Sequence, residues 1–204
     1  MSTSSTIIEE IETMRRSGSA SLAIYYYDFR EDEKKDLRGL LSSVLFQLCD
    51  QSISYYDIMS SFYSIHRHGK QSPSDEALVR CLRNLLQLPG HVPIFLFVDA
   101  LDECANTPAL SSPRQEVLRL LAELVDSQLP NLRICITSRP EADIRPVLEP
   151  LTFRSISLHD ESGQMKDIED YIKSVVNNNR QTRRWKPEHK QLVIDVLSER
   201  ADGM

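Results

Sequence analysis

Hydrophobic residues along the chain follow two patterns, one typical of buried strands and the other of helices. Short, nearly continuous apolar runs predict strands that are covered on both faces of a parallel sheet, and they lie at residues 21–29, 94–98 and 132–137. A fourth strand is predicted at residues 153–158, where apolar and polar side chains are mixed.

Between these runs, apolar residues recur every three or four positions, which predicts amphipathic helices. The expected helices cover residues 3–16, 37–48, 53–65, 113–128, 141–149, 163–176 and 187–200. A further helix is expected after Ser72, which would cap it and leave Pro73 at the first helical position. Strands that alternate with helices predict an α/β fold with a parallel sheet, and the last two helices, which have no strand between them, predict the start of a helical subdomain.

Composition narrows the function classes. The 204 residues are enough for one α/β domain and the start of a second. A net charge of −6 argues against nucleic acid as a partner, and no apolar run is long enough to cross a membrane. The four cysteines show no metal-binding spacing, so we expect buried thiols and a reducing, cytoplasmic location.

Acidic side chains follow the central apolar run directly. Asp99 comes right after residues 94–98, and Asp102 and Glu103 come just behind it. Ligands of parallel sheets bind beyond the carboxyl ends of the strands. A carboxylate at that place suits a hydrated Mg²⁺, which prefers one or two carboxylates plus phosphate oxygens. On this stretch alone, simple helix capping by the acidic residues is an equally good interpretation.

The next strand along the chain also ends in polar residues, namely Thr137, Ser138 and Arg139. If the two strands are neighbours, a carboxylate for Mg²⁺, a second to polarise water and a cation near the γ-phosphate share one crevice. These are most of the parts of a phosphoryl-transfer site. Taken alone, the segment 138–140 fits a plain strand-to-helix turn better.

Together these segments resemble a known family. The Walker B segment of NACHT-type STAND NTPases resembles IFLFVDALDEC, their sensor-one strand resembles LRICITSRPE, and the strand before Walker B resembles LAIYYYDFR. The chain is most similar to the nephrocystin-type N-terminal NACHT module of fungal NLR-like proteins. The resemblance implies a three-layer parallel sheet of the P-loop NTPase (ASCE/STAND) type with strand order 5-1-4-3-2. It also implies a partial NTPase core over residues 1–160, with Walker B at 94–103 and sensor-one at 132–139, and a helical subdomain that begins within 161–204.

The resemblance also implies roles for individual residues. Asp99 would hold Mg²⁺ through water, Asp102 and Glu103 would orient the attacking water, and Arg139 would act as the γ-phosphate sensor. Ser138 would contact the nucleotide. Intact members of this family use Mg²⁺ with ATP or GTP, and they associate with themselves or with other NACHT subunits.

One family motif is absent, because the sequence contains no G-x-x-x-x-G-K-[ST] phosphate loop. Relative to the family, the chain resembles a member whose first strand and phosphate loop are missing. Losing three hydrogen bonds to charged phosphate oxygens costs about 5–9 kcal/mol. A micromolar ligand binds with only about 8 kcal/mol. We therefore expect no nucleotide to be bound or hydrolysed by this chain alone.

Three functions are compatible with the sequence. The first is a fragment of a nucleotide-dependent signalling switch of the NACHT type. The second is a non-catalytic interaction or scaffold module derived from such an NTPase. The third is an unrelated metal-dependent enzyme such as a nuclease, which the acidic charge of the chain disfavours.

Overall fold

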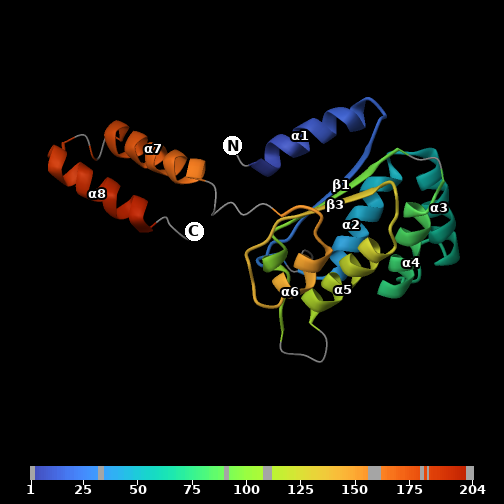
Figure 1. Cartoon of the computed structure of the whole chain (residues 1–204). Helices are drawn as coiled ribbons and strands as arrows, with labels where there is room; N and C mark the ends of the chain where they lie inside the picture. Colours follow the sequence, from blue (N-terminus) through green and yellow to red (C-terminus); the bar gives the residue numbers. More distant parts are fainter. Residues whose placement is uncertain are drawn as a thin grey trace. The chain divides into compact units, whose positions relative to one another are not determined.

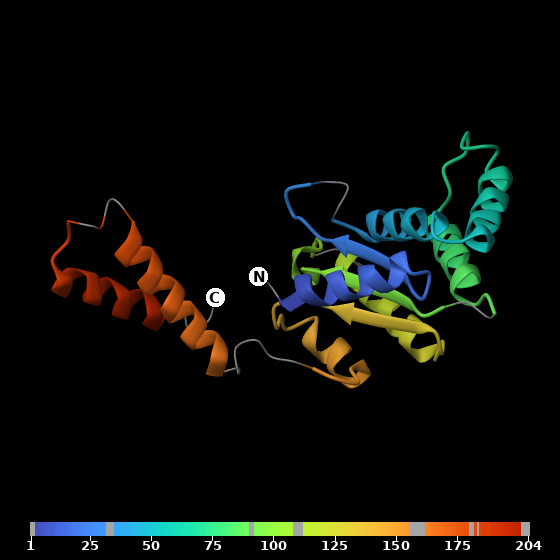
Figure 2. The same cartoon turned by 90° about the horizontal axis from the view of Figure 1, so that it is seen from above.

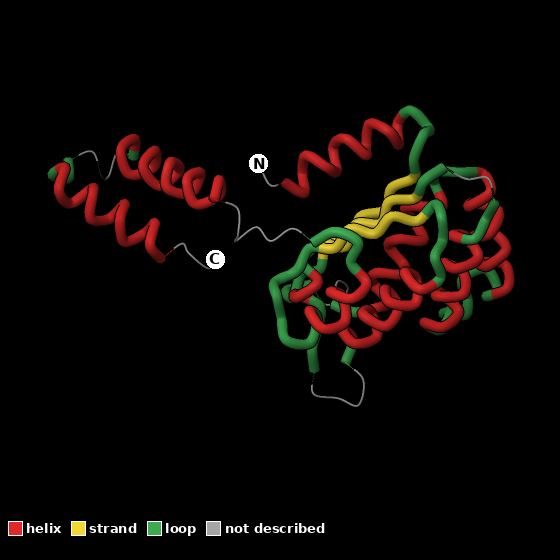
Figure 3. Tube along the Cα trace, viewed as in Figure 1, coloured by secondary structure: helices red, strands yellow, loops and turns green. Residues whose placement is uncertain are grey.

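A computed structural model describes residues 3–31, 35–89, 92–107, 112–155, 162–179, 182 and 184–200. The chain forms two compact units, Met1–Leu151 and Thr152–Met204. The first unit contains the sheet and most of the helices, and the second contains a pair of helices (Figures 1 and 3).

The sheet has three parallel strands, β1 (Ser21–Tyr26), β2 (Ile94–Asp99) and β3 (Leu132–Ile136), in the order β1-β2-β3. Tyr26 pairs with Asp99, and Val98 pairs with Ile136, so all three strands end at the same edge of the sheet (Figure 2). The predicted α/β class is therefore confirmed, as is the adjacency of the strands that carry the two polar ends.

Helices cover both faces of this sheet (Figure 1). One face packs against α2, α4 and α5, and the opposite face packs against α1. The helices of this unit are α1 (Thr3–Arg16), α2 (Leu37–Cys49), α3 (Ile53–Ile65), α4 (Asp75–Leu86) and α5 (Pro113–Asp126). Successive strand residues alternate between the faces, so Leu96 joins the large core while Phe97 contacts the small cluster around Ile11 of α1.

The large core is built from the apolar stripes that the sequence shows on α2, α4 and α5. Its fully buried side chains include Leu41, Leu85 and Leu121, together with Tyr55 from α3. Burial of each such leucine stabilises the fold by about 1.5–3 kcal/mol. This core holds β2 and the turn that follows it in place.

Two predictions about the elements need correction. The helix expected to be capped by Ser72 is instead capped by Ser74, whose hydroxyl accepts the N–H of Ala77 at 3.3 Å. This start places Asp75 and Glu76 in the first turn, where the helix dipole favours negative charge. The helix expected at 141–149 is a short α6 (Arg145–Leu148) followed by the 3₁₀ turn η3 (Glu149–Leu151).

The fourth predicted strand is wrong over residues 153–155. Residues 153–155 are irregular, and the remaining residues of that prediction, 156–158, lie outside the described residues. A strand needs a neighbour for its backbone hydrogen bonds, and the sheet in the described residues contains only β1, β2 and β3.

The second unit consists of α7 (Ser162–Asn178) and α8 (Pro187–Arg200), which pack against each other. Val176 and Ile194 are the apolar side chains buried within this pair. The two successive helices agree with the pattern read from the sequence. No helix in the described ranges has both the length and the apolar character to cross a bilayer.

The two outer strands differ in whether side chains hydrogen-bond to the backbone of their outer edges. At β1, Gln51, which follows α2, accepts the N–H of Leu22 at 2.9 Å and donates to its carbonyl at 2.6 Å. One turn earlier, Gln47 does the same for Ile24, at 2.9 and 2.7 Å. These two side-chain amides take the place of a neighbouring strand and close the edge of β1.

The outer edge of β3 has no such cover in the described part of the chain. Thr137 donates its N–H to Val98, and Ile94 donates to the carbonyl of Asn131, so these β3 positions face β2. Because alternate residues of a strand direct their backbone groups to opposite sides, Ile134 and Ile136 present theirs to the open side. The sheet can therefore accept a further strand next to β3.

The glutamine cover of β1 can be tested with a double variant. Replacing Gln47 and Gln51 by leucine removes their four hydrogen bonds to β1 and two more to residues of α2, which should lower the free energy of unfolding by about 2–4 kcal/mol. The uncovered edge should also increase self-association. Urea unfolding and light scattering measure both effects.

The matched control is Gln87→Leu, which changes an exposed glutamine at the end of α4. Its free energy of unfolding should stay within about 0.5 kcal/mol of that of the parent. A double variant as stable as this control, with unchanged particle size, would show that the glutamines do not close the edge.

Candidate functional site

A tight turn at the end of β2 brings the acidic residues to the edge of the sheet. Ala100 adopts left-handed backbone angles, with φ 54° and ψ 48°, and the 3₁₀ turn η2 (Leu101–Glu103) follows at once. Leu101 is completely buried and anchors the turn in the core. Its N–H donates to the carbonyl of Thr137 at 3.0 Å, which ties the turn to the end of β3.

Asp99 is oriented by Thr137 of the neighbouring strand. The Thr137 hydroxyl donates to Oδ1 of Asp99 at 2.6 Å and accepts the N–H of Ala100 at 3.0 Å. The second carboxylate oxygen, Oδ2, has no hydrogen-bond partner among the residues that the structure describes. One oxygen of Asp99 is thus fixed by the fold.

Asp102 contacts Arg139, which follows β3. Oδ1 of Asp102 accepts the backbone N–H of Arg139 at 3.1 Å, and Oδ2 lies 3.4 Å from its Nε. The Asp102 side chain is only 11% exposed, whereas the Arg139 side chain is 81% exposed. The carboxylate therefore holds the segment after β3, while most of the guanidinium remains open to solvent.

Glu103 connects the same turn to the segment after β1. Its Oε2 accepts the N–H of Phe29 at 3.4 Å. Phe29 itself is 62% exposed, and the guanidinium of Arg30 lies 5.7 Å from the centre of its ring. At the carboxyl edge of the sheet, Asp99 and Asp102 thus contact the segment after β3, and Glu103 contacts the segment after β1.

Ser138 is the exception among the predicted site residues. It is exposed, and its hydroxyl donates to the carbonyl of Arg139 at 2.8 Å, away from the carboxylates. Its contact with a nucleotide stays a prediction. Thr137 is the residue that actually links the two strand ends, and its place directly after β3, opposite Asp99, is the signal that identifies it.

The donor set at this edge fits magnesium better than a transition metal. Within the described ranges, no three His, Cys, Asp or Glu side chains are close enough to hold a metal ion. A single carboxylate oxygen from Asp99 suits a hydrated Mg²⁺, which takes its other ligands from water and phosphate. Such an ion depends on a phosphate ligand for most of its affinity.

Thiol chemistry is disfavoured here although a cysteine ends the turn. Cys104 is buried, and its Sγ donates to the carbonyl of Lys35 at 3.2 Å. Burial raises the pKa of the Cys104 thiol to about 12. The side chain therefore stays a neutral thiol at physiological pH and is a poor nucleophile.

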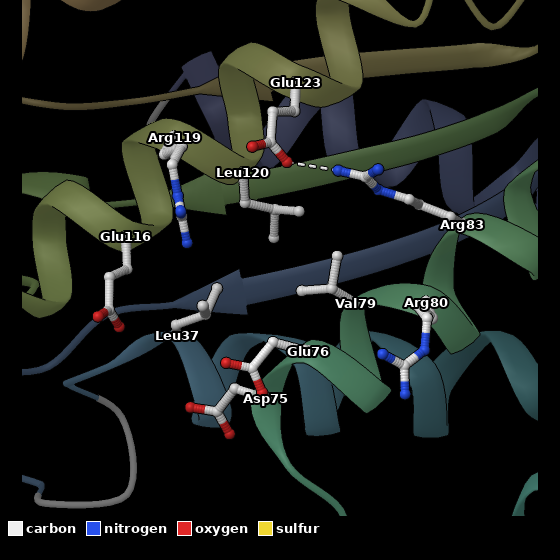
Figure 4. A pocket seen from close by; sticks show the side chains of 10 residues that line it. All are labelled: Leu37, Asp75, Glu76, Val79, Arg80, Arg83, Glu116, Arg119, Leu120 and Glu123. Carbon is white, nitrogen blue, oxygen red and sulfur yellow. Dashed lines mark hydrogen bonds and ion pairs between the residues drawn. The ribbon is translucent and has the colours of Figure 1, made fainter.

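Two clefts open on the helical side of the sheet, and the acidic edge lines neither of them. One of about 310 Å³ lies between α4 and α5 (Figure 4), and one of about 460 Å³ lies between α3 and α4. Arg83 pairs with Glu123 across the first cleft, and Asp75 at its rim pairs with Arg38 of α2 at 2.5 Å. These ion pairs link α4 to α5 and α2 to α4.

Comparison with known families gives one match. A family model described as nephrocystin 3, N-terminal, matches residues 2–139. The matched range runs from α1 to the end of the acidic edge and contains every residue of the predicted site. No curated protein and no solved structure matches the chain.

The left-handed turn at Ala100 generates a stability prediction. A β-branched side chain is disfavoured at such angles, so Ala100→Val should lower the free energy of unfolding by roughly 1–2 kcal/mol. Ala100→Gly should remain within about 1 kcal/mol of the parent, because relief of strain is offset by greater freedom in the unfolded chain. Thermal denaturation measures both variants.

Ala142→Val serves as the control, since Ala142 is exposed and has no positive φ. It should change stability by no more than about 0.5 kcal/mol. Equal effects of valine at positions 100 and 142 would contradict the assigned strain.

Proposed function

The chain belongs to the nephrocystin 3 N-terminal family, and from this membership we propose that it forms the acidic half of a nucleotide-dependent signalling switch of the NACHT type. In this proposal residues 94–103 act as a Walker B segment and residues 132–139 as a sensor-one strand of a P-loop NTPase core. The supporting observation is the hydrogen-bonded edge where Asp99 meets Thr137 and Asp102 meets Arg139.

Each side chain at this edge has a distinct role. Asp99 offers its open oxygen to hydrated Mg²⁺, which when bound neutralises the charge of the phosphates. Glu103 orients water, and the exposed guanidinium of Arg139 contacts the γ-phosphate. The carboxylate of Asp102 is nearly buried against Arg139, so its role is to place Arg139 and not to polarise water.

The phosphate-binding loop has to come from a segment next to β3. The sequence has no Walker A motif, and the open edge of β3 offers the backbone groups of Ile134 and Ile136 to a further parallel strand. The β1 edge cannot serve, because Gln47 and Gln51 occupy it. A strand beside β3 would deliver its following loop to the same edge as Asp99.

In the full switch, we propose that nucleotide binding controls association with further copies or with other NACHT subunits. The cofactors of the full switch are Mg²⁺ and ATP or GTP, and we expect that the present chain alone does not bind them. Without the loop, the edge lacks the several backbone N–H groups that normally bind the phosphates.

Calorimetry with the chain alone tests this proposal. Titration with Mg-ATP or Mg-GTP should show no saturation below millimolar nucleotide. A longer protein with an in-frame G-x-x-x-x-G-K-[ST] before residue 1 should bind at micromolar concentrations. In that protein Asp99→Asn should weaken binding by about tenfold or more, because the ligand of the metal is lost.

Asp57→Asn, an exposed change on α3, is the control and should leave the affinity unchanged. Micromolar binding by the chain alone would contradict the proposed need for a second segment.

A non-catalytic scaffold is the second candidate. Asp102 and Glu103 accept hydrogen bonds from the backbone N–H groups of Arg139 and Phe29. Both carboxylates therefore have a structural role without any nucleotide. If Asp99→Asn leaves nucleotide binding by the longer protein unchanged, or if no phosphate loop is encoded upstream, the scaffold function is favoured.

A further inference from the structure

A buried arginine lies directly behind the acidic edge. Arg114 is the only charged residue that is buried in the described part of the chain, with 8% of its surface exposed. It is the second residue of α5, just after Pro113 and the cap formed by Ser112 with Gln115. This cap fixes the first turn of the helix and therefore the place where the Arg114 side chain begins.

The guanidinium of Arg114 contacts three residues in two segments, the turn after β2 and the stretch before α6. Nη2 donates to the carbonyls of Asp102 at 2.5 Å and Cys104 at 3.0 Å, and Nε donates to the same Cys104 carbonyl at 3.1 Å. Nη1 lies 3.3 Å from both carboxylate oxygens of Asp143, in the segment between β3 and α6. Asp143 in turn accepts from the side-chain amide of Asn106 at 3.1 Å.

Burial makes this position selective for arginine over lysine. A charged group that leaves water has to be paired and hydrogen-bonded, and here Asp143 supplies the charge while two carbonyls accept the remaining protons. The flat guanidinium serves all these acceptors in fixed directions. A lysine ammonium is a point charge on a flexible chain and cannot hold the same set.

The contacts also meet at one residue of the proposed site. The backbone carbonyl of Asp102 is held by Arg114, and its carboxylate is held by Arg139. Rotation of the turn at Asp102 would break both, and it would also move Glu103 away from Phe29.

We propose that Arg114 is a positioning residue for the acidic edge: together with Asp143 it fixes the η2 turn so that Asp99, Asp102 and Glu103 keep their directions. The link to metal binding rests on the proposed function. The link to the shape of the turn does not, since it follows from the hydrogen bonds alone.

Amide hydrogen exchange tests the positioning role without any ligand. In Arg114→Lys, exchange of the amides of Cys104, Ala105 and Arg139 should accelerate by about tenfold or more, because charged hydrogen bonds to the turn are lost. Amides of Leu96 and Val98 in β2 should keep their rates. Arg119→Lys, an exposed arginine on the same helix, is the matched control and should change none of them.

A second measurement uses Mn²⁺ alone as the probe. Because one carboxylate oxygen binds the ion weakly, Mn²⁺ is added at about millimolar concentration; paramagnetic broadening of amides near Asp99 should be lost in Asp99→Asn and reduced in Arg114→Lys. Asp143→Asn, which keeps the shape of its side chain, should reproduce both effects in smaller measure. It replaces Arg114→Lys in every comparison if that variant does not fold.

The two measurements distinguish the positioning role of Arg114 from the proposed metal binding at Asp99. Exchange in Arg114→Lys that matches Arg119→Lys, or that accelerates equally in β2, overturns the positioning role. Mn²⁺ broadening that Asp99→Asn leaves unchanged counts against the proposed function alone, because the exchange measurement does not involve a metal.

Discussion

The parallel register of three strands is the constraint on which the candidate site depends. Because β2 and β3 run in the same direction with Val98 opposite Ile136, the residues that follow them emerge side by side. A shift of one residue would turn Ile134 out of the core and separate Thr137 from Asp99. The same alternation of apolar side chains that builds the core therefore also sets the position of the carboxylates.

The carboxylates of the site serve as connectors as well as candidate ligands. Asp99 binds the end of β3, Asp102 binds the segment after it, and Glu103 binds the segment after β1. These contacts hold the edge in one arrangement before any ligand arrives, which lowers the cost of organising a site. They also use up acceptor capacity, so the described residues leave few oxygens of these carboxylates without a hydrogen bond.

The sequence predicted the elements better than the interactions between them. Residues 94–98 and 132–137 are mostly apolar and contain several β-branched side chains, so both strands and their polar ends could be identified, whereas their adjacency was implied only by the family resemblance. The roles of Gln47 and Arg114 could not be predicted. On a helical pattern Gln47 is an ordinary polar position and Arg114 an ordinary first-turn residue, and only the tertiary fold brings them to β1 and η2. The expected strand is wrong over residues 153–155 for a similar reason, since a local pattern does not supply a pairing partner.

The glutamine-covered edge of β1 also limits how copies of this chain could join through their sheets. Within the residues that the structure describes, each molecule offers one open strand, β3, and the opposite side ends in Gln47 and Gln51. Two molecules that joined β3 to β3 would have a covered strand at each end of the combined sheet, and no third molecule could add to it. A contact of that kind closes as a pair and cannot propagate into a fibre.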